Sequence, residues 1–161
     1  MEIERKFLIK NYSGNLSELE HHELKQGYIS TKPVIRIRKW DNTKILTIKS
    51  SGLIMRDEYE IELSEDEFQN LEKKVEGNII NKTRYIIPIN NNLKIEMDIF
   101  HDIFEGLCYG EVEFPDIETA ENFKAPDFMY KDISKSGVFQ NSSLSRMELS
   151  DVSAFIKNAY K

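Results

Sequence analysis

Cysteine, histidine and long apolar runs are scarce in this sequence. Its one cysteine, Cys108, cannot form an intramolecular disulfide, and the first residues do not resemble a cleavable leader, so we expect a reducing, cytoplasmic setting. No apolar run approaches the roughly 20 residues that cross a bilayer, so we expect no transmembrane helix and no membrane partner. The histidines His21, His22 and His101 lack the spacing of zinc ligands, which argues against a zinc enzyme.

Positive charge is also in deficit. The 161 residues carry 22 Lys and Arg against 28 Asp and Glu, a formal net charge of −6. A protein that binds a nucleic-acid polymer must neutralise many phosphates, so this balance argues against that class but leaves room for a local basic pocket. The length suits one domain over residues 1–161, and the 40% hydrophobic content is enough to build its core.

Most of the chain alternates polar and apolar residues with period two, which is typical of strands. The runs follow one another as sequential neighbours, which predicts an antiparallel sheet. Eight strands are expected over residues 2–8, 24–29, 34–40, 44–50, 55–63, 79–89, 93–100 and 107–114. One helix is expected over 65–76, with Ser64 and Glu67 as a capping box and Gly77 as its end. Further helices are expected over 17–22, 117–123 and 151–160.

The polar face of these strands is almost entirely ionic. It carries the cations Lys6, Arg36, Arg38, Lys49, Arg56, Lys82 and Arg84, and the anions Glu2, Glu4, Glu58, Glu60, Glu62, Glu96, Asp98, Glu111 and Glu113. A solvated outer face with cross-strand ion pairs of about 0.2–1 kcal/mol each explains any single strand. Such strands in succession favour a second interpretation, in which charged rows line a hollow and helices cover the apolar rows. We therefore predict an α+β fold, an eight-stranded antiparallel closed β-barrel or tunnel with helices packed on the outside.

A lumen of this kind suits a small polyanion and a divalent metal. Arg and Lys side chains on rigid strands match a linear triphosphate, which concentrates negative charge over a short length. Carboxylates in the same cavity would repel that anion unless a cation lay between them, and carboxylate oxygens select Mg²⁺ or Mn²⁺. Glutamates at i and i+2 on a strand lie roughly 7 Å apart on one face. Glu2 with Glu4, and Glu111 with Glu113, are therefore candidate ligand pairs.

The order of these ionic motifs resembles the CYTH, or triphosphate tunnel metalloenzyme, superfamily. Residues 2–6 are similar to its E-x-E-x-K signature, and the similarity continues with Q-G-Y at 26–28, R-x-R at 36–38, T-x-K at 47–49, R-x-E-x-E at 56–60, K-x-R-Y at 82–85 and E-x-E at 111–113. The agreement covers nearly all of residues 1–114. The strand over 93–100 lacks the tryptophan of the family pattern, and the tail over 128–134 departs from it.

The resemblance implies roles for individual residues. It implies a basic side that binds a triphosphate through Lys6, Arg36, Arg38, Lys49, Arg56, Lys82 and Arg84. It implies an acidic side that holds Mg²⁺ or Mn²⁺, with Glu2, Glu4 and Glu113 as ligands and Glu60, Glu62, Asp98 and Glu111 near the ions directly or through water. Lys82 and Tyr28 occupy the positions of a Lys–Tyr pair that assists proton transfer in some members. A wall aromatic explains Tyr28 equally well.

Hydrolysis of inorganic tripolyphosphate ranks first among the activities of such a family, because positioning, metal and cations suffice for it. Hydrolysis of nucleoside triphosphates ranks next, and thiamine triphosphate has no dedicated signal. A class IV-type adenylyl cyclase that makes cyclic AMP from ATP needs a purine pocket that the sequence does not reveal. A non-catalytic module that binds polyphosphate or nucleotide stays open. The expected partner is a triphosphate-containing small molecule, and a homodimer is left open.

Overall fold

The structure, a computed structural model, describes residues 3–50 and 57–161. Two predicted site residues, Glu2 and Arg56, lie outside the described residues, as does the start of the strand expected over 55–63. The chain divides into two compact units. Unit 1 comprises Met1–His22, Lys82–Ser136 and Asp151–Lys161, and unit 2 comprises Glu23–Asn81 and Gly137–Ser150. Both units draw on separate stretches of chain, and the expectation of one domain over residues 1–161 stays a prediction.

Unit 1 is built on antiparallel strands. They are β1 (Ile3–Ile9), β7 (Lys94–Phe100), β8 (Cys108–Phe114) and β9 (Met129–Asp132), with the part of β6 (Glu76–Pro88) that begins at Lys82 and the first residues of β2 (Glu20–Thr31). Antiparallel ladders join β6 to β7, β7 to β8, β8 to β1 and β1 to β9. Side chains alternate between the two faces of such strands, so the polar and apolar rows of the sequence separate onto opposite faces.

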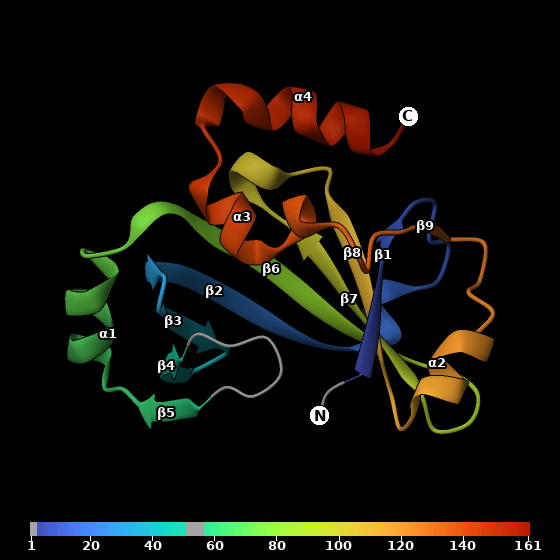
Figure 1. Cartoon of the computed structure of the whole chain (residues 1–161), viewed down its shortest axis with the longest axis horizontal. Coiled ribbons are helices and arrows are strands. Elements are labelled where there is room, and N and C mark those ends of the chain that lie inside the picture. The colour runs from blue at the N-terminus through green and yellow to red at the C-terminus, as the bar shows by residue number, and fades with distance from the viewer. Residues whose placement is uncertain (1–2, 51–56) are drawn as a thin grey trace. The chain divides into compact units, whose positions relative to one another are not determined.

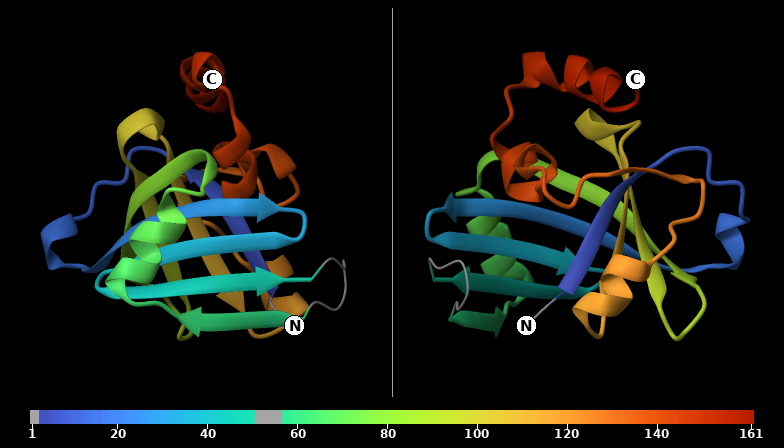
Figure 2. Two further views of the ribbon diagram at one scale, coloured as in Figure 1. Left: turned by 90° about the vertical axis from the view of Figure 1, so that its left-hand side faces the viewer. Right: turned by 45° about the vertical axis from the view of Figure 1, so that its right-hand side comes forward.

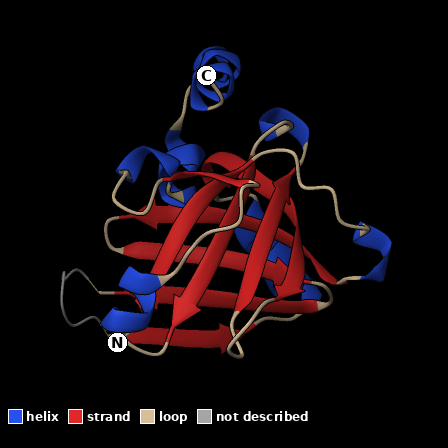
Figure 3. Ribbon diagram, turned by 90° about the vertical axis from the view of Figure 1, so that its right-hand side faces the viewer, coloured by secondary structure: helices blue, strands red, loops and turns tan. Residues whose placement is uncertain are grey.

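One face of these strands carries the apolar core of unit 1. Its buried members are Phe7, Ile9, Ile87, Ile95, Met97, Val112, Phe114, Ala120 and Met129. Helix α2 (Ile117–Asn122) contacts β1 and β8, and the strands run side by side beside it (Figure 3). The Asp116 side chain caps α2 by accepting a hydrogen bond from the Thr119 backbone N–H. Helix α4 (Leu149–Ala159) buries Val152 and Ala159.

Unit 2 is built on β3 (Val34–Trp40), β4 (Thr43–Lys49) and β5 (Glu58–Glu62), with the remainder of β2 and the first residues of β6 (Figure 1). Antiparallel ladders join β2 to β3, β3 to β4 and β4 to β5. Helix α1 (Glu65–Glu72) packs against β3 and crosses these strands (Figure 2). Val75 lies so close to Gly27 that a Cβ there would approach it to 2.8 Å, which explains the glycine. Helix α3 (Asn141–Arg146) completes the unit.

The prediction of a closed eight-stranded barrel is wrong. The strands form a nine-stranded sheet in the order β5-β4-β3-β2-β6-β7-β8-β1-β9. β5 and β9 stand at the two ends of this order, and no ladder within residues 3–50 and 57–161 joins them. The α+β class and the antiparallel ladders agree with the prediction, but the sheet is open and contains β9, which the sequence interpretation omitted.

Several smaller expectations are tested as well. The helices expected over 117–123 and 151–160 are confirmed as α2 and α4. The capping box of Ser64 and Glu67 is confirmed by reciprocal hydrogen bonds, although α1 ends at Glu72 rather than at residue 76. The helix expected over 17–22 is wrong, because a 3₁₀ turn (Leu16–Glu18) is followed by β2. Within the described ranges, no helix is both long and apolar enough to span a membrane.

Candidate functional site

The ionic side chains of unit 1 share one face of its strands. In the ladders, Lys6 pairs with Glu111, Glu111 with Glu96, and Asp98 with Arg84. Residues directly opposite each other in an antiparallel ladder point to the same side. The face opposite the apolar core therefore carries an ionic row that steps along β7, with Lys6, Glu111 and Glu96 on one line and Asp98 and Arg84 on the next. Ile86 and Tyr109 complete these two lines.

The centre of this row is a buried cluster of one anion and two cations. The Lys82 Nζ lies 2.8 Å from Asp98 Oδ2, and the two side chains are 1% and 3% exposed. Arg84 donates to the same carboxylate twice, from Nε to Oδ1 at 2.7 Å and from Nη2 to Oδ2 at 2.9 Å. A bidentate, charge-assisted contact of this kind fixes both partners. The cluster has one net positive charge in a nearly dry environment.

Burial and charge act against each other on the Asp98 carboxyl. Burial raises the pKa of Asp98, but the Lys82 ammonium and the Arg84 guanidinium outweigh it and hold that pKa at about 2, below its ordinary 3.8. Burial by itself lowers the pKa of Arg84, whereas Asp98, Glu96 and Glu111 raise it above its usual range. Asp98 is therefore ionised, and Arg84 stays charged, at neutral pH.

Two half-buried ion pairs extend the cluster toward the acidic end of the face. Lys6 Nζ lies 3.0 Å from Glu111 Oε1, and Arg84 Nη1 lies 3.0 Å from Glu96 Oε2. Lys6 also lies over the Tyr109 ring, 5.4 Å from its centroid. Each of these carboxylates has a cation beside it. Glu111 therefore forms an ion pair with Lys6, although the Glu96 carboxylate stands opposite it in the β7–β8 ladder.

Glu4 and Glu113 face each other across the β1–β8 ladder. Both side chains are exposed, and two like charges directly opposite on a sheet repel each other unless a cation lies between them. No group of three His, Cys, Asp or Glu side chains in the described part of the chain is arranged to hold a metal ion. Glu2, the third predicted ligand, lies outside the described residues. The described chain therefore supplies two carboxylates in register at this end.

Unit 2 contains a basic pocket on the ionic face of β3 and β4. Its volume is about 230 Å³, and it is lined by Arg36, Arg38, Trp40, Thr43, Ile45, Thr47 and Glu60. Arg36 and Arg38 lie two residues apart on β3 and point to one side, where Thr47 and Ile45 of β4 stand opposite them. The pocket has an ionic end at the arginines and an aromatic side at Trp40.

Two hydrogen-bond donors around this pocket have no acceptor among the described residues. Gln26 is buried, and its Oε1 accepts from Arg38 Nε at 2.8 Å, but its Nε2 has no partner there. Arg36 Nε is likewise buried without an acceptor in that part of the chain, and its Nη2 makes only a long contact of 3.5 Å to Thr47 Oγ1. A buried donor without an acceptor costs about 1–3 kcal/mol, a cost that an anion reaching these groups would offset.

The other predicted residues of unit 2 lie on or beside the same face. Lys49 and Glu58 stand opposite each other in the β4–β5 ladder, as do Thr47 and Glu60. Glu62 is exposed at the end of β5. Tyr28 is buried opposite Arg36 in the β2–β3 ladder.

The predicted groups are divided between the two units. Tyr28, Glu60 and Glu62 belong to unit 2, whereas Lys82, Asp98 and Glu113 belong to unit 1. The pairing of Lys82 with Tyr28 and the shared metal set stay predictions.

Sequence reasoning missed the contribution of neutral side chains. Gln26 was recognised within Q-G-Y but received no role, although it holds Arg38. Gln26 stands opposite Arg38 in the β2–β3 ladder and points to the same face. This pairing was the signal that could have assigned Gln26 a role. Trp40, to which no sequence motif assigned a role, lines the arginine pocket.

Comparisons with known proteins identify relatives of this chain. The family model of the CYTH domain matches residues 1–147. An inorganic triphosphatase from Nitrosomonas europaea is 32% identical over 146 residues, which cover 89% of this chain and 95% of that protein. The crystal structure of an inorganic triphosphatase aligns with a TM-score of 0.77 at 29% identity, covering 92% of this chain and 96% of that one. A Hippeastrum protein described as having a dominant triphosphatase activity shares the fold, with a TM-score of 0.51 at 17% identity and coverage of 75% and 83%.

Proposed function

This chain belongs to the CYTH domain family, and from that premise we propose that it is a metal-dependent triphosphatase that hydrolyses the terminal phosphate of inorganic tripolyphosphate or a related triphosphate. The observation that carries the proposal is the arginine pocket of unit 2, where buried donors lack acceptors among the described residues. The name of the relative from Nitrosomonas europaea supports the choice of reaction.

Arg36 and Arg38 bind phosphate oxygens in this proposal. A guanidinium offers several N–H donors in a planar fork that matches a phosphate, and two forks on one strand reach neighbouring phosphates. Gln26 accepts a hydrogen bond from Arg38 Nε. This contact orients the Arg38 guanidinium and therefore its two terminal nitrogens. Lys49 adds positive charge on the same face of unit 2, and phosphate binding by Lys6 of unit 1 is a separate proposal. The substrate is thereby bound by groups positioned before it arrives.

Carboxylates Glu4 and Glu113 fit a divalent cation. Mg²⁺ is commonly bound by one or two protein carboxylates together with substrate phosphates, so a pair in register is enough without a third described ligand. Glu2, Glu60, Glu62, Asp98 and Glu111 remain proposed members of the wider set. When bound, Mg²⁺ or Mn²⁺ supplies charge neutralisation at the phosphate oxygens.

The chain's own residues then need only to orient the reactants and stabilise charge. Phosphoryl transfer is driven mainly by positioning and electrostatics. Lys82 contacts Asp98 at 2.8 Å. We assign Lys82, together with Arg84, the role of a cation held in place by that contact. The proton-transfer pairing of Lys82 with Tyr28 is the second, separable part of the proposal.

The test is phosphate release from purified full-length protein with Mg²⁺ or Mn²⁺. Tripolyphosphate, ATP, thiamine triphosphate and diphosphate are compared, with and without EDTA. We expect metal-dependent release of phosphate from tripolyphosphate, and a loss of at least about tenfold in kcat/KM when Arg38 is replaced by Ala, since charged hydrogen bonds contribute about 1.5–3 kcal/mol. Lys157→Ala, on exposed α4, is the matched control and should leave the rate unchanged.

The alternatives give different products. Cyclic AMP and diphosphate from ATP would replace the proposal with the cyclase. Tight binding of tripolyphosphate without turnover, in every metal condition, would replace it with a binding module.

A further inference from the structure

A second pocket lies in unit 1, away from the ionic face. Its volume is about 560 Å³, and it is lined by residues from the β6–β7 turn, from α2 and from the segment after α2: Ile89, Asn90, Asn91, Leu93, Glu118, Thr119, Asn122, Phe123, Lys124 and Pro126. That volume falls within the usual range for small-molecule sites. Ile89, Leu93 and Phe123 pack against the apolar core, so the pocket opens on the face opposite Arg84 and Glu111.

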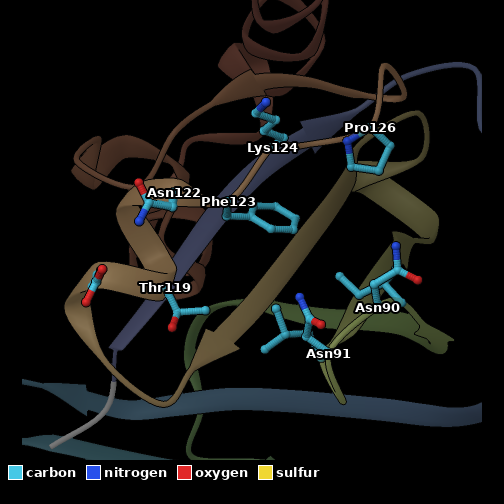
Figure 4. A pocket seen from close by; sticks show the side chains of 10 residues that line it. Asn90, Asn91, Thr119, Asn122, Phe123, Lys124 and Pro126 are labelled. Atoms are coloured by element: carbon cyan, nitrogen blue, oxygen red, sulfur yellow. The ribbon is translucent and has the colours of Figure 1, made fainter.

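The floor of this pocket is apolar and its rim is amide-rich. Ile89, Leu93 and Phe123 are only partly buried and keep uncovered surface here. Figure 4 shows the Phe123 ring in the middle, with Thr119 and Asn122 on one side and Asn90 and Asn91 on the other. Ligand sites in proteins combine such an apolar lining with a few convergent polar groups.

Within the described ranges, the asparagine side chains of the lining hydrogen-bond neither one another nor residues of the core. Asn90, Asn91 and Asn122 are exposed, and their side chains make no hydrogen bond to another residue of the described ranges. The left-handed backbone of Asn91, with φ of 63°, explains an asparagine at that position. It does not explain Asn90 or Asn122. Each carboxamide offers both a donor and an acceptor to a ligand.

Arg5 of β1 holds the side of the pocket that α2 forms. Arg5 Nη1 donates to the Ala120 carbonyl at 2.9 Å and to the Phe123 carbonyl at 3.3 Å, and Arg5 Nη2 pairs with Asp132 at 2.8 Å. The turn on the other side is closed by hydrogen bonds from Ile89 N–H to the Leu93 carbonyl and from Leu93 N–H to the Asn90 carbonyl. Both sides of the pocket are thus preorganised, which lowers the entropic cost of binding.

The charge of the lining excludes the substrate of the ionic face. Glu118 and Lys124 are the charged residues of the lining, and they cancel. With no arginine and no excess of cations, the pocket offers nothing that would bind a triphosphate. An uncharged ligand with a flat apolar ring and alternating donors and acceptors matches the Phe123 ring and the amides.

We propose that this pocket binds the base of an uncharged nucleoside. Aromatic side chains stack on the flat faces of bases, and asparagine forms bidentate hydrogen bonds with base edges. The Phe123 ring therefore suits the face of a base, and the asparagine amides suit its edge. The site is separate from the proposed triphosphate chemistry and stands whether or not that chemistry is correct.

The test uses the full chain with adenosine, guanosine, cytidine and uridine, each at about 1 mM, followed by saturation-transfer NMR and titration. We expect at least one nucleoside to bind through its base protons. Asn90→Ala combined with Asn122→Ala should weaken that binding about tenfold or more, because two hydrogen bonds are lost. Asn158→Ala, an exposed asparagine of α4 outside the lining, is the matched control and should bind normally.

Phe123→Leu gives a second, independent reading, since it keeps an apolar side chain but removes the flat ring. It should also weaken binding, while thermal unfolding of each variant confirms that the chain is folded. No binding by any of the four nucleosides would overturn the proposal. Binding by ribose that matches the nucleoside, or binding unchanged in the double asparagine variant, would overturn it as well.

Discussion

Asp98 holds two cations at once in the buried cluster of unit 1. Replacing it by Asn keeps its shape but removes the charge that Lys82 and Arg84 share. An uncompensated buried charge typically costs about 3–5 kcal/mol, and we expect Asp98→Asn to lose about that much free energy of unfolding at pH 7, measured by urea denaturation. Glu96→Gln is the control, because Arg84 keeps its ion pair with Asp98 in that variant. The Glu96→Gln variant should lose less than about 1 kcal/mol of the free energy of unfolding.

The same residue predicts a pH dependence. The folded pKa of Asp98 is about 2 and lies below its ordinary 3.8. A depressed carboxyl pKa stabilises the fold above the unfolded value, and this contribution is lost as the pH falls through the folded value. We therefore expect the wild-type protein to lose stability between about pH 4 and pH 2, and the Asp98→Asn variant to show a flatter profile there. Parallel profiles would contradict the assignment.

Gln26 is the neutral residue on which the arginine pocket depends. Its Oε1 accepts from Arg38 Nε at 2.8 Å. Gln26→Leu should let the Arg38 fork rotate, and we expect KM for tripolyphosphate to rise about fivefold or more with a smaller change in kcat. Gln69→Leu on exposed α1 is the matched control, since Gln69 bonds only Glu65 among the described residues. An unchanged KM in the Gln26 variant would show that Arg38 is held by other contacts.

At the scale of elements, the C-terminal end of α4 is tied to β8 by one hydroxyl. Tyr160 Oη accepts from the Cys108 backbone N–H at 2.9 Å and donates to the Cys108 carbonyl at 3.1 Å. Tyr160→Phe removes both bonds and leaves two half-buried backbone groups unpaired, so we expect a loss of about 1–3 kcal/mol in chemical denaturation. Tyr130→Phe is the control, since within residues 3–50 and 57–161 its hydroxyl bonds only the exposed Lys161 carbonyl.

Burial raises the pKa of Tyr160 to about 12 from its ordinary 10. A raised pKa stabilises the fold below the unfolded value, and that contribution disappears as the pH rises through the folded one. The wild type should therefore lose stability between about pH 10 and pH 12, and Tyr160→Phe should lose less there. An equal alkaline loss in both proteins would assign the effect to another group.

Elements were predictable from sequence where one local rule applied without competition. The capping box at Ser64 fixed the start of α1, and the period-two runs located the long strands. The turn before β2 failed because residues 17–22 have helical spacing over too few residues to resist extension of β2 back to Glu20. β9 has only Met129 buried, so its alternation is too short to recognise, and its pairing with β1 depends on tertiary contact.

At the scale of the molecule, the family and the sharing of faces were predictable but closure was not. The CYTH resemblance is confirmed by the match over residues 1–147. The period-two pattern predicts which residues share a face of the sheet. The pairing of Lys6 with Glu111 and of Arg84 with Asp98 agrees with that prediction. The pattern carries no information on whether the first and last strands of a sheet meet. That depends on strand number, tilt and stagger, and here β5 and β9 end the order.

Binding of the proposed triphosphate to this chain, whose net charge is −6, should show in the overall stability of the fold. A ligand that binds only the folded state stabilises it by about 2.7 kcal/mol at 100 times Kd. We expect tripolyphosphate with Mg²⁺ to raise the unfolding midpoint of the full chain accordingly, in differential scanning calorimetry at fixed ionic strength.

The Arg36→Ala, Arg38→Ala double variant should lose most of this shift, since it removes both guanidinium groups of the pocket. Lys157→Ala should retain it. Sulfate at equal ionic strength separates specific binding from general salt effects, which screen charges over about 10 Å at 0.1 M. A shift of the same size with sulfate, or one that survives in the double variant, would mean that the stabilisation does not come from triphosphate held by these arginines.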